Sequence, residues 1–278
     1  MVVLYLGDCL EKMKSVADKS VDLIICDLPF GCLIGGGGKE KINRKAQKLI
    51  DFRNTSGKVT KKLNVYGGVI SGCSWDIKIE LVEFWKQVKR IRKNDHTPTL
   101  MFCTTKYGFD LYNSNPKEFR YDLVWDKQRG VSFLTANKMP MRSHEMIYVF
   151  SKAGANYNRI DMSGNVTPRK ETSVLHTSRT IKASSGLRIQ KENDGTKKCP
   201  LSVIQFNKLQ NSGKLHPTEK PVELYKYLIE RYSNSDDTVL DPTFGSGNSG
   251  LACNELTRNY IGIEKDNNFF WMFAKKVI

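Results

Sequence analysis

The sequence predicts an α/β fold in which a mostly parallel sheet carries helices on both faces. Apolar runs alternate with amphipathic stretches from the start of the chain, in VVLYL, CLEKMKSVA and VDLIICDLPFG. This order of strand, helix and strand is typical of parallel sheets. Near the other end, VLDPTFGSGNSG places a glycine-rich loop directly after an apolar run, as in nucleotide-like cofactor sites. A length of 278 residues with 40% hydrophobic content suffices for the core of such a fold.

The individual strands and helices are predicted from the spacing of apolar residues along the chain. Strands are predicted at VVLYL, VDLIIC, TLMFCT, FRYDLVWDK, HEMIYVFSK, TVLDPTF and NYIGIEKD. Of these, HEMIYVFSK is bounded by polar residues, as an outer or antiparallel strand would be. Helices are predicted at CLEKMKSVA, IELVEFWKQVKRIRK, VELYKYLIERYS, GNSGLACNELT and NNFFWMFAKKVI.

The positive charge is concentrated in two segments. The formal net charge is +15, of which residues 31–72 contribute +7 and residues 151–214 contribute +8. A solvated surface without a partner usually spreads its charge, so this concentration indicates a polyanion such as the phosphate backbone of nucleic acid. Residues 151–214 also lack long periodicity. We therefore expect one domain from residues 1–150 and 215–278, with 31–72 as a basic loop insertion, and a separate segment at 151–214.

Several classes of protein do not fit the composition. No apolar run approaches the roughly 18 residues of a membrane span, and MVVLYLGDCLEKM lacks the features of a signal peptide. A cytoplasmic protein without a membrane partner is therefore expected. The seven cysteines are scattered without a CxxC pair, which argues against a disulfide framework and against a metal site.

The glycine-rich loop predicts a cofactor site. Gly245, Gly247 and Gly250 satisfy GxGxxG between a strand and a helix, and Glu264 ends the next strand, where a carboxylate can accept hydrogen bonds from ribose hydroxyls. A nicotinamide dinucleotide needs a second half-domain downstream, and only one strand and one helix remain. S-adenosylmethionine needs less of the chain downstream of the loop and fits the short remaining segment better. A tight turn without a ligand is the alternative.

A second candidate site is DLPFG, residues 27–31, at the end of a predicted strand. Pro29 holds Leu28 extended, which presents the Leu28 carbonyl beside the Asp27 carboxylate and next to the ring of Phe30. An exocyclic amine on a flat base fits this arrangement, because its two N–H groups can donate to the two acceptors while the base stacks on the ring. An ordinary turn that ends the strand is the alternative.

These motifs resemble those of one enzyme family. DLPFG resembles the DPPY motif of amino-methylating DNA methyltransferases, and HPTEKPVELYKYLIERYSNSDDTVLDPTFGSGNSG resembles their cofactor region. The order of the motifs is that of the β group of this family. The resemblance implies a circularly permuted, Rossmann-like S-adenosylmethionine-dependent methyltransferase fold with a seven-stranded mixed sheet. It further implies methyl transfer to double-stranded DNA, with 151–214 as the target-recognition segment.

The resemblance also implies a role for individual residues. The flipped base would be held by Asp27, Leu28, Pro29 and Phe30. The cofactor would be bound by Asp8, Cys9, His216, Thr218, Lys220, Pro221, Asp241, Phe244, Gly245, Ser246, Gly247, Asn248 and Glu264. Phosphate contacts are expected from Lys39, Arg44 and Lys45 in the basic insertion. Leu28, Phe30 and Asn248 depart from the proline, tyrosine and threonine of the family pattern, and none of these changes removes an essential group.

The base and the partners are less closely specified. An Asp-type motif goes mostly with adenine N6, so Asp27 favours N6-adenine methylation. An N4-cytosine enzyme, an RNA adenine methyltransferase and a DNA-binding protein without catalysis are the alternatives. A homodimer, a cognate restriction enzyme, and a bacterial or phage origin are compatible with the family.

The permuted order makes a geometric prediction. VVLYL should lie beside the strand that ends at Glu264, with residues 1 and 278 on one side of the sheet. Asp8, Asp27, Gly245 and Glu264 should then converge on one cleft. Two minor features are predicted to be structural: Asp76, with Trp75, should anchor the catalytic loop, and the histidines 96, 144 and 176 should be surface or core residues.

Overall fold

The computed structural model describes residues 1–31, 76–131, 133, 136–165, 172–175, 187–190, 195–207 and 219–277. These residues form two compact units, and each is considered by itself. The larger unit comprises Met1–Asn156 and Val203–Ile278, and the smaller one comprises Tyr157–Ser202. Across the described part of the chain, no helix combines the length and the apolar character that crossing a membrane requires.

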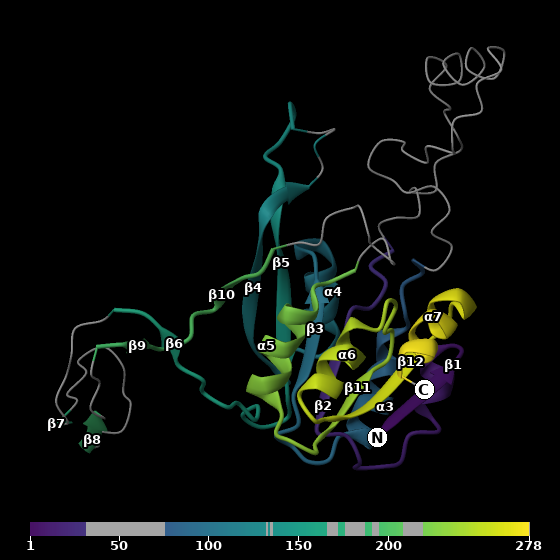
Figure 1. Cartoon of the computed structure of the whole chain (residues 1–278), viewed down its shortest axis with the longest axis horizontal. Coiled ribbons are helices and arrows are strands. Elements are labelled where there is room, and N and C mark those ends of the chain that lie inside the picture. The colour runs from purple at the N-terminus through teal and green to yellow at the C-terminus, as the bar shows by residue number, and fades with distance from the viewer. Residues whose placement is uncertain are drawn as a thin grey trace. The chain divides into compact units, whose positions relative to one another are not determined.

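The larger unit is built on a mixed sheet of eight strands in the order β1-β12-β11-β2-β3-β5-β4-β10 (Figure 1). The strands are β1 (Val2–Leu6), β2 (Leu23–Cys26), β3 (Thr99–Cys103), β4 (Phe119–Val131), β5 (Arg142–Phe150), β10 (Val203–Gln205), β11 (Thr238–Asp241) and β12 (Asn259–Glu264). Only β5 runs antiparallel to its neighbours, as its polar flanks predicted. The eighth strand was not expected, because β10 is a three-residue edge strand within a segment without periodicity.

The sheet is completed by the front of the chain, as the permuted order predicted. Strand β1 pairs in parallel with β12, with Val2 opposite Tyr260 and Leu6 opposite Glu264. The terminal amino group of Met1 donates a hydrogen bond of 3.0 Å to Asn259 Oδ1. The last helix, α7 (Asn267–Val277), lies against β1 and β12. Residue 278 itself lies outside the described residues.

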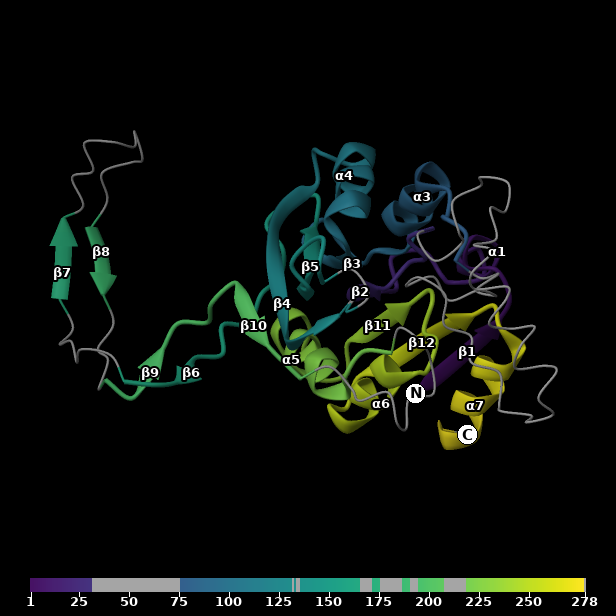
Figure 2. The same cartoon turned by 90° about the horizontal axis from the view of Figure 1, so that it is seen from above.

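Helices cover both faces of the sheet (Figure 2). One face carries α1 (Cys9–Met13), α3 (Leu81–Ile91) and α4 (Thr105–Ser114), and the other carries α5 (Val222–Tyr232), α6 (Asn248–Glu255) and α7. Strand β2 serves both cores, because Leu23 and Ile25 point to one and Ile24 and Cys26 to the other. A strand buried on both faces needs a continuous apolar run, which explains the sequence LIIC.

The described residues of the smaller unit form two short antiparallel pairs of strands. Strand β6 (Met162–Ser163) pairs with β9 (Lys197–Lys198), and β7 (Thr172–Leu175) pairs with β8 (Leu187–Gln190). This unit falls inside the segment 151–214 that the sequence assigned to target recognition. That role stays a prediction.

Candidate cofactor and base-binding site

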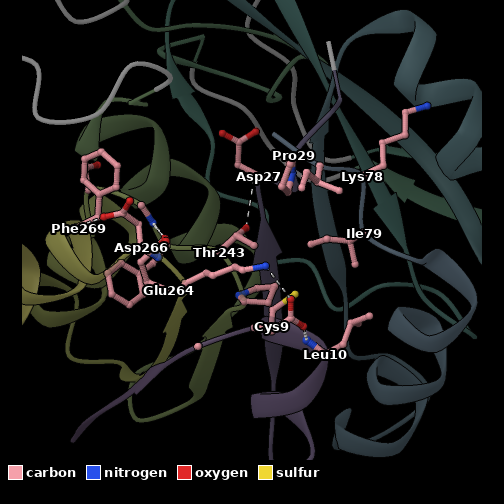
Figure 3. Close-up of a pocket in the computed structure, with 18 of the residues that line it drawn as sticks. Cys9, Leu10, Asp27, Pro29, Lys78, Ile79, Thr243, Glu264, Asp266 and Phe269 are labelled. Carbon is pink, nitrogen blue, oxygen red and sulfur yellow. Dashed lines mark hydrogen bonds and ion pairs between the residues drawn. The ribbon is translucent and has the colours of Figure 1, made fainter. Parts of the chain in front are cut away.

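A pocket of about 410 Å³ lies where four parallel strands, β1, β2, β11 and β12, end. Open α/β sheets bind their ligands at this edge. The pocket is lined by Asp8, Asp27, Gly245 and Glu264, so these residues from distant parts of the sequence share one cavity. In Figure 3, Asp27 and Pro29 lie on one side of the pocket, and Glu264 and Phe269 lie on another.

Glu264 is held by backbone groups at the carboxyl end of β12. The amide of Gly245 donates to Glu264 Oε2 over 2.8 Å, and the amide of Asp266 donates to Oε1 over 2.7 Å. Burial raises the pKa of Glu264, and these two hydrogen bonds oppose the rise. Because each carboxylate oxygen has a second lone pair, Glu264 can still accept from a pair of hydroxyl groups. This geometry suits a ribose.

The glycines of the loop do not all face the pocket. Gly245 lines it with a φ of 55°. Gly247 has a φ of 81°, and a Cβ atom there would lie 2.1 Å from Cδ2 of Phe273 on α7. A Cβ atom on Gly250 would lie 2.3 Å from Cζ of the same ring. The second and third glycines are therefore required for the packing of α6 against α7, in addition to any contact of the loop with a ligand.

A chain of four charges, formed by two half-buried carboxylates and two buried lysines, begins at Asp27. Lys220 Nζ forms an ion pair with Asp27 Oδ2 and lies 3.7 Å from Glu145 Oε2. Glu145 Oε1 in turn accepts from Lys127 Nζ over 2.5 Å. Both lysine side chains are only 4% exposed. Such burial requires paired charges, and the alternation of two carboxylates with two ammonium groups meets that requirement.

The chain of charges affects the protonation of its members. Burial raises the pKa of Asp27, while the charge of Lys220 opposes the rise and that of Glu145 adds to it. For Lys220, burial acts against the charged form, but the carboxylates of Asp27 and Glu145 outweigh it and raise the pKa. Lys220 thus stays a cation, and its charge favours the ionised form of Asp27.

The loop after Asp27 is fixed at four points. Thr243 Oγ1 donates to the Asp27 carbonyl over 3.3 Å (Figure 3), and the Gly31 amide donates to Asp76 Oδ1 over 2.9 Å. The predicted anchoring role of Asp76 is thereby confirmed. Leu28 is buried in the core. The half-buried ring of Phe30 lies 5.1 Å from the ring of Tyr107, at an interplanar angle of 35°.

The other predicted site residues fall into three groups. The pocket is also lined by Cys9, Pro29, Lys220, Phe244 and Ser246. Behind it, Asn248 Nδ2 donates to Glu219 Oε1 over 2.9 Å and to the Lys220 carbonyl over 2.8 Å, which ties the glycine loop to the segment before α5. Pro221 is the N-cap residue of α5. Outside the described residues lie Lys39, Arg44, Lys45, Trp75, His176, His216 and Thr218.

The structure adds residues that the sequence did not single out. The pocket also includes the segment Ile77–Glu80, together with Tyr225, Thr243 and Phe269. More important are Lys127 and Glu145, because they extend the charges at Asp27 into the core. Lys127 ends the predicted strand FRYDLVWDK and Glu145 lies near the start of HEMIYVFSK, and both strands hold other polar residues, so the sequence does not set these two apart.

Asp241 is buried beneath the glycine loop with both oxygens in hydrogen bonds. Thr243 N donates to Oδ1 over 3.0 Å, and Ser249 Oγ donates to Oδ2 over 2.6 Å. Burial raises the pKa of Asp241 to about 7, against these two hydrogen bonds. The acid therefore gains a proton in the folded protein at a higher pH than in the unfolded chain.

This difference predicts a pH-dependent stability. The contribution of Asp241 to the free energy of unfolding is fully present below about pH 4 and is lost as the pH rises to about 7. Its upper limit is roughly 4 kcal/mol. Asp241→Asn keeps the size and one acceptor oxygen without a charge, and its amide nitrogen can donate to the Ser249 hydroxyl in place of the bond that Asp241 accepts. We therefore expect the variant to lose this slope and to be more stable than the parent at pH 8. Urea unfolding from pH 4.5 to 8 measures it. Parallel curves for the two proteins would contradict the expectation.

Comparison with known proteins identifies the family of this pocket and its motifs. Residues 21–275 match the model of the N6/N4 methyltransferase family, described as DNA methylase. The chain belongs to this DNA methylase family. It is therefore a DNA methyltransferase of the class that modifies exocyclic amino groups, with adenine N6 and cytosine N4 as the two members of the class.

Individual DNA methylases are similar over different lengths. Type II methyltransferase M.HinfI of Haemophilus influenzae is 26% identical over 286 residues, which cover 98% of this chain and 67% of M.HinfI. Type II methyltransferase M.XycI of Xanthomonas campestris pv. cyanopsidis is 28% identical over 158 residues, which cover 57% of this chain and 44% of M.XycI. The chain thus spans about two thirds of the first relative and matches less than half of the second.

Solved structures share the fold. The M1.HpyAVI–SAM complex has a TM-score of 0.55 at 19% identity and covers 100% of this chain and 99% of that one. The cytosine-N4-specific PvuII DNA methyltransferase has a TM-score of 0.61 at 16% identity, with coverage of 100% and 86%. At these identities the likeness concerns the methyltransferase fold, so the choice of base depends on the residues of the pocket.

Proposed function

We propose that the protein is a site-specific DNA methyltransferase that transfers a methyl group from S-adenosylmethionine to the N6 amine of a flipped adenine. The observation that carries the proposal is the carboxylate of Asp27 at the pocket, directly after β2. An Asp-type motif favours adenine, whereas Ser-type motifs go mostly with cytosine. The N4-cytosine alternative keeps support from the cytosine-N4-specific PvuII enzyme, which has the same fold.

The cofactor half of the pocket suits S-adenosylmethionine. When bound, this cofactor supplies the electrophilic methyl group. The Glu264 carboxylate is directed by two backbone amides to accept from the ribose. Asp8 accepts from the amide of Leu10 over 3.0 Å through Oδ1 and would use Oδ2 for the adenine amine. The M1.HpyAVI structure of the same fold was solved with the cofactor, which supports this assignment.

The base half of the pocket suits an exocyclic amine. The Asp27 carboxylate and the Leu28 carbonyl would accept from its two N–H groups, and Phe30 would stack on the ring. These hydrogen bonds favour a nitrogen whose lone pair points out of the ring plane, toward the methyl group. Methyl transfer would join the methyl carbon to the amine nitrogen, leave the sulfur of the cofactor as a neutral thioether and make the nitrogen cationic. The negative charge of Asp27 stabilises that cation before it loses a proton.

Asp27 must be ionised to accept a hydrogen bond from the amine and to supply the charge opposite the cation. The methylation rate should therefore depend on pH. The rate should fall as the pH falls through the pKa of Asp27. Lys220→Met removes the cation that lowers this pKa. The acid limb of the profile of kcat against pH should therefore shift to higher pH by about 1 to 3 units. Glu145→Gln removes a carboxylate that raises the pKa of Asp27, so the limb should move down.

Because the two variants should shift the acid limb in opposite directions, the prediction can be distinguished from a general loss of activity through damage to the fold. Pre-steady-state methyl transfer from pH 5 to 9 measures the limb independently of the amplitude of the rate. Two variants whose limbs stay at the parental pH, or move in the same direction, would contradict the role given to the chain of charges.

Incorporation of a tritiated methyl group tests the proposed function. Duplex DNA is incubated with the protein and labelled S-adenosylmethionine and is then digested to nucleosides. We expect the label in N6-methyldeoxyadenosine. Label in N4-methyldeoxycytidine would contradict the base, and preferential labelling of competing RNA would contradict the substrate. Cofactor binding without any labelling would favour a DNA-binding protein without catalysis. Pairing with a restriction enzyme is proposed from the Type II relatives, and a homodimer stays a prediction.

A further inference from the structure

The β4–β5 hairpin extends well beyond the edge of the sheet at which the pocket lies (Figure 1). Cys26, which precedes Asp27, is in the same row of the sheet as Met101 and Tyr148. From Tyr148, β5 continues for six more residues to Arg142, which pairs with Val131. At about 3.3 Å a residue, the hairpin rises about 20 Å above the row of Cys26 before its turn begins.

The base of this hairpin is fixed in the core. Trp125 is buried, and its Nε1 donates to the Phe206 carbonyl over 2.9 Å. Across from it, Glu145 pairs with Trp125 in the strand register and holds Lys127 in the chain of charges. The part beyond residue 127 is therefore a projection from a well-packed support.

The end of the hairpin, here called the ribbon tip, comprises the described residues between Gln128 and Arg142. Its side chains are of two kinds. Phe133, Met139 and Met141 are exposed apolar residues, and Phe133 is 77% exposed. Arg129 and Lys138 are exposed cations. From residue 128 to residue 144 the sequence contains no Asp or Glu. The ribbon tip is therefore positively charged and apolar at once.

We propose that the ribbon tip enters a groove of the DNA duplex and that Phe133 acts as a wedge beside the flipped base. This inference rests on the proposed function. A base whose amine reaches Asp27 leaves its duplex above the same edge of the sheet, which is the edge from which the ribbon projects. The major groove is about 12 Å wide and admits a two-stranded ribbon.

The chemistry of the tip suits this partner. Proteins that open or bend duplex DNA insert apolar side chains such as Phe and Met between base steps. Cations beside the wedge can neutralise the phosphates on both sides of the groove. An apolar protein surface would leave Arg129 and Lys138 without a counter-charge, which favours DNA as the occupant.

The wedge is tested by Phe133→Ala on two substrates. One duplex carries the recognition site found by sequencing methylated DNA, and the other carries the same site with the target adenine opposite a mismatch. Opening the second duplex is easier because the target base is already unpaired. We expect kcat/KM to fall about tenfold or more on the paired duplex, from the size of base stacking on aromatic side chains. On the mismatched duplex the fall should be less than about threefold.

Phe109→Ala is the matched control, because Phe109 is an exposed phenylalanine on α4, outside the hairpin. It should leave both substrates unaffected. Equal losses on the two duplexes, or no loss on the paired one, would overturn the wedge. A wild-type protein that methylates neither duplex would overturn the proposed function as well. If the wedge prediction fails while the wild-type protein still methylates the mismatched duplex, the wedge is overturned and the proposed function is not.

The cations of the ribbon tip are tested separately by the double variant Arg129→Gln, Lys138→Gln. Binding to the paired duplex is measured by fluorescence anisotropy at several salt concentrations. Loss of two phosphate contacts should reduce the slope of log K against log salt by about two. An unchanged slope would overturn the entry of the tip into the groove.

Discussion

Asp27→Ala is expected to lower methyl transfer by at least about 10²-fold while the cofactor still binds. Asp27 and Glu264 lie on different sides of the pocket (Figure 3), which we propose to be the base side and the cofactor side. The substitution removes both the acceptor for the target amine and the charge that stabilises the methylated cation. Single-turnover transfer and calorimetric titration with S-adenosylhomocysteine measure the two effects separately.

Two further variants make this result specific. Asp27→Asn keeps one acceptor oxygen without the charge, so its rate should lie between those of the parent and of Asp27→Ala. Asp22→Asn is the control, because Asp22 precedes the same strand at its other end, where it pairs with Lys93 over 2.7 Å. Its rate should be that of the parent. Normal methylation by Asp27→Ala would show that the catalytic assignment is wrong.

Gly247→Ala is expected to destabilise the protein by about 2–5 kcal/mol and to weaken cofactor binding. The residue has a φ of 81°, and the new Cβ would lie 2.1 Å from the buried ring of Phe273. A left-handed conformation costs an alanine about 1–2 kcal/mol, and overpacking adds about 1–3 kcal/mol. Because Gly247 directly precedes α6, any shift of the helix also displaces Gly245 and Ser246 at the pocket.

The matched control is Gly154→Ala. A Cβ atom at Gly154 meets no atom within 4 Å, and its backbone is not left-handed. Its free energy of unfolding should change by less than about 1 kcal/mol. Urea unfolding and cofactor titration of both variants decide the point. Equal stability of the two glycine variants would refute the packing role of Gly247.

The fold was largely predictable because its signals are local. Strands buried on both faces, such as β2 and β11, need continuous apolar runs, and the glycine loop marks the strand before it. The permuted order was implied by the resemblance, in which the DLPFG motif comes first and the glycine loop last. Strand β10 was not predictable, because three residues at a sheet edge carry too little pattern to be distinguished from a loop.

The candidate site was predictable only in part, for a related reason. Asp27, Gly245 and Glu264 belong to motifs that are contiguous in sequence or joined by one strand and helix. The contacts of Lys127 and Glu145 depend on the antiparallel pairing of β4 with β5 and on the long-range approach of Lys220. No local pattern encodes such an approach. Likewise, the exclusion of a side chain at Gly250 depends on a ring more than one helix away, on α7.

The proposed position of the adenine N6 amine against Asp27 can be tested by sequencing DNA from living cells. DNA from cells that express the wild-type protein is compared, by single-molecule sequencing that detects modified bases, with DNA from cells that express Asp27→Ala. We expect N6-methyladenine at one recurring sequence in the first sample and none in the second. N4-methylcytosine in the first sample, or methylation that persists with Asp27→Ala, would contradict it.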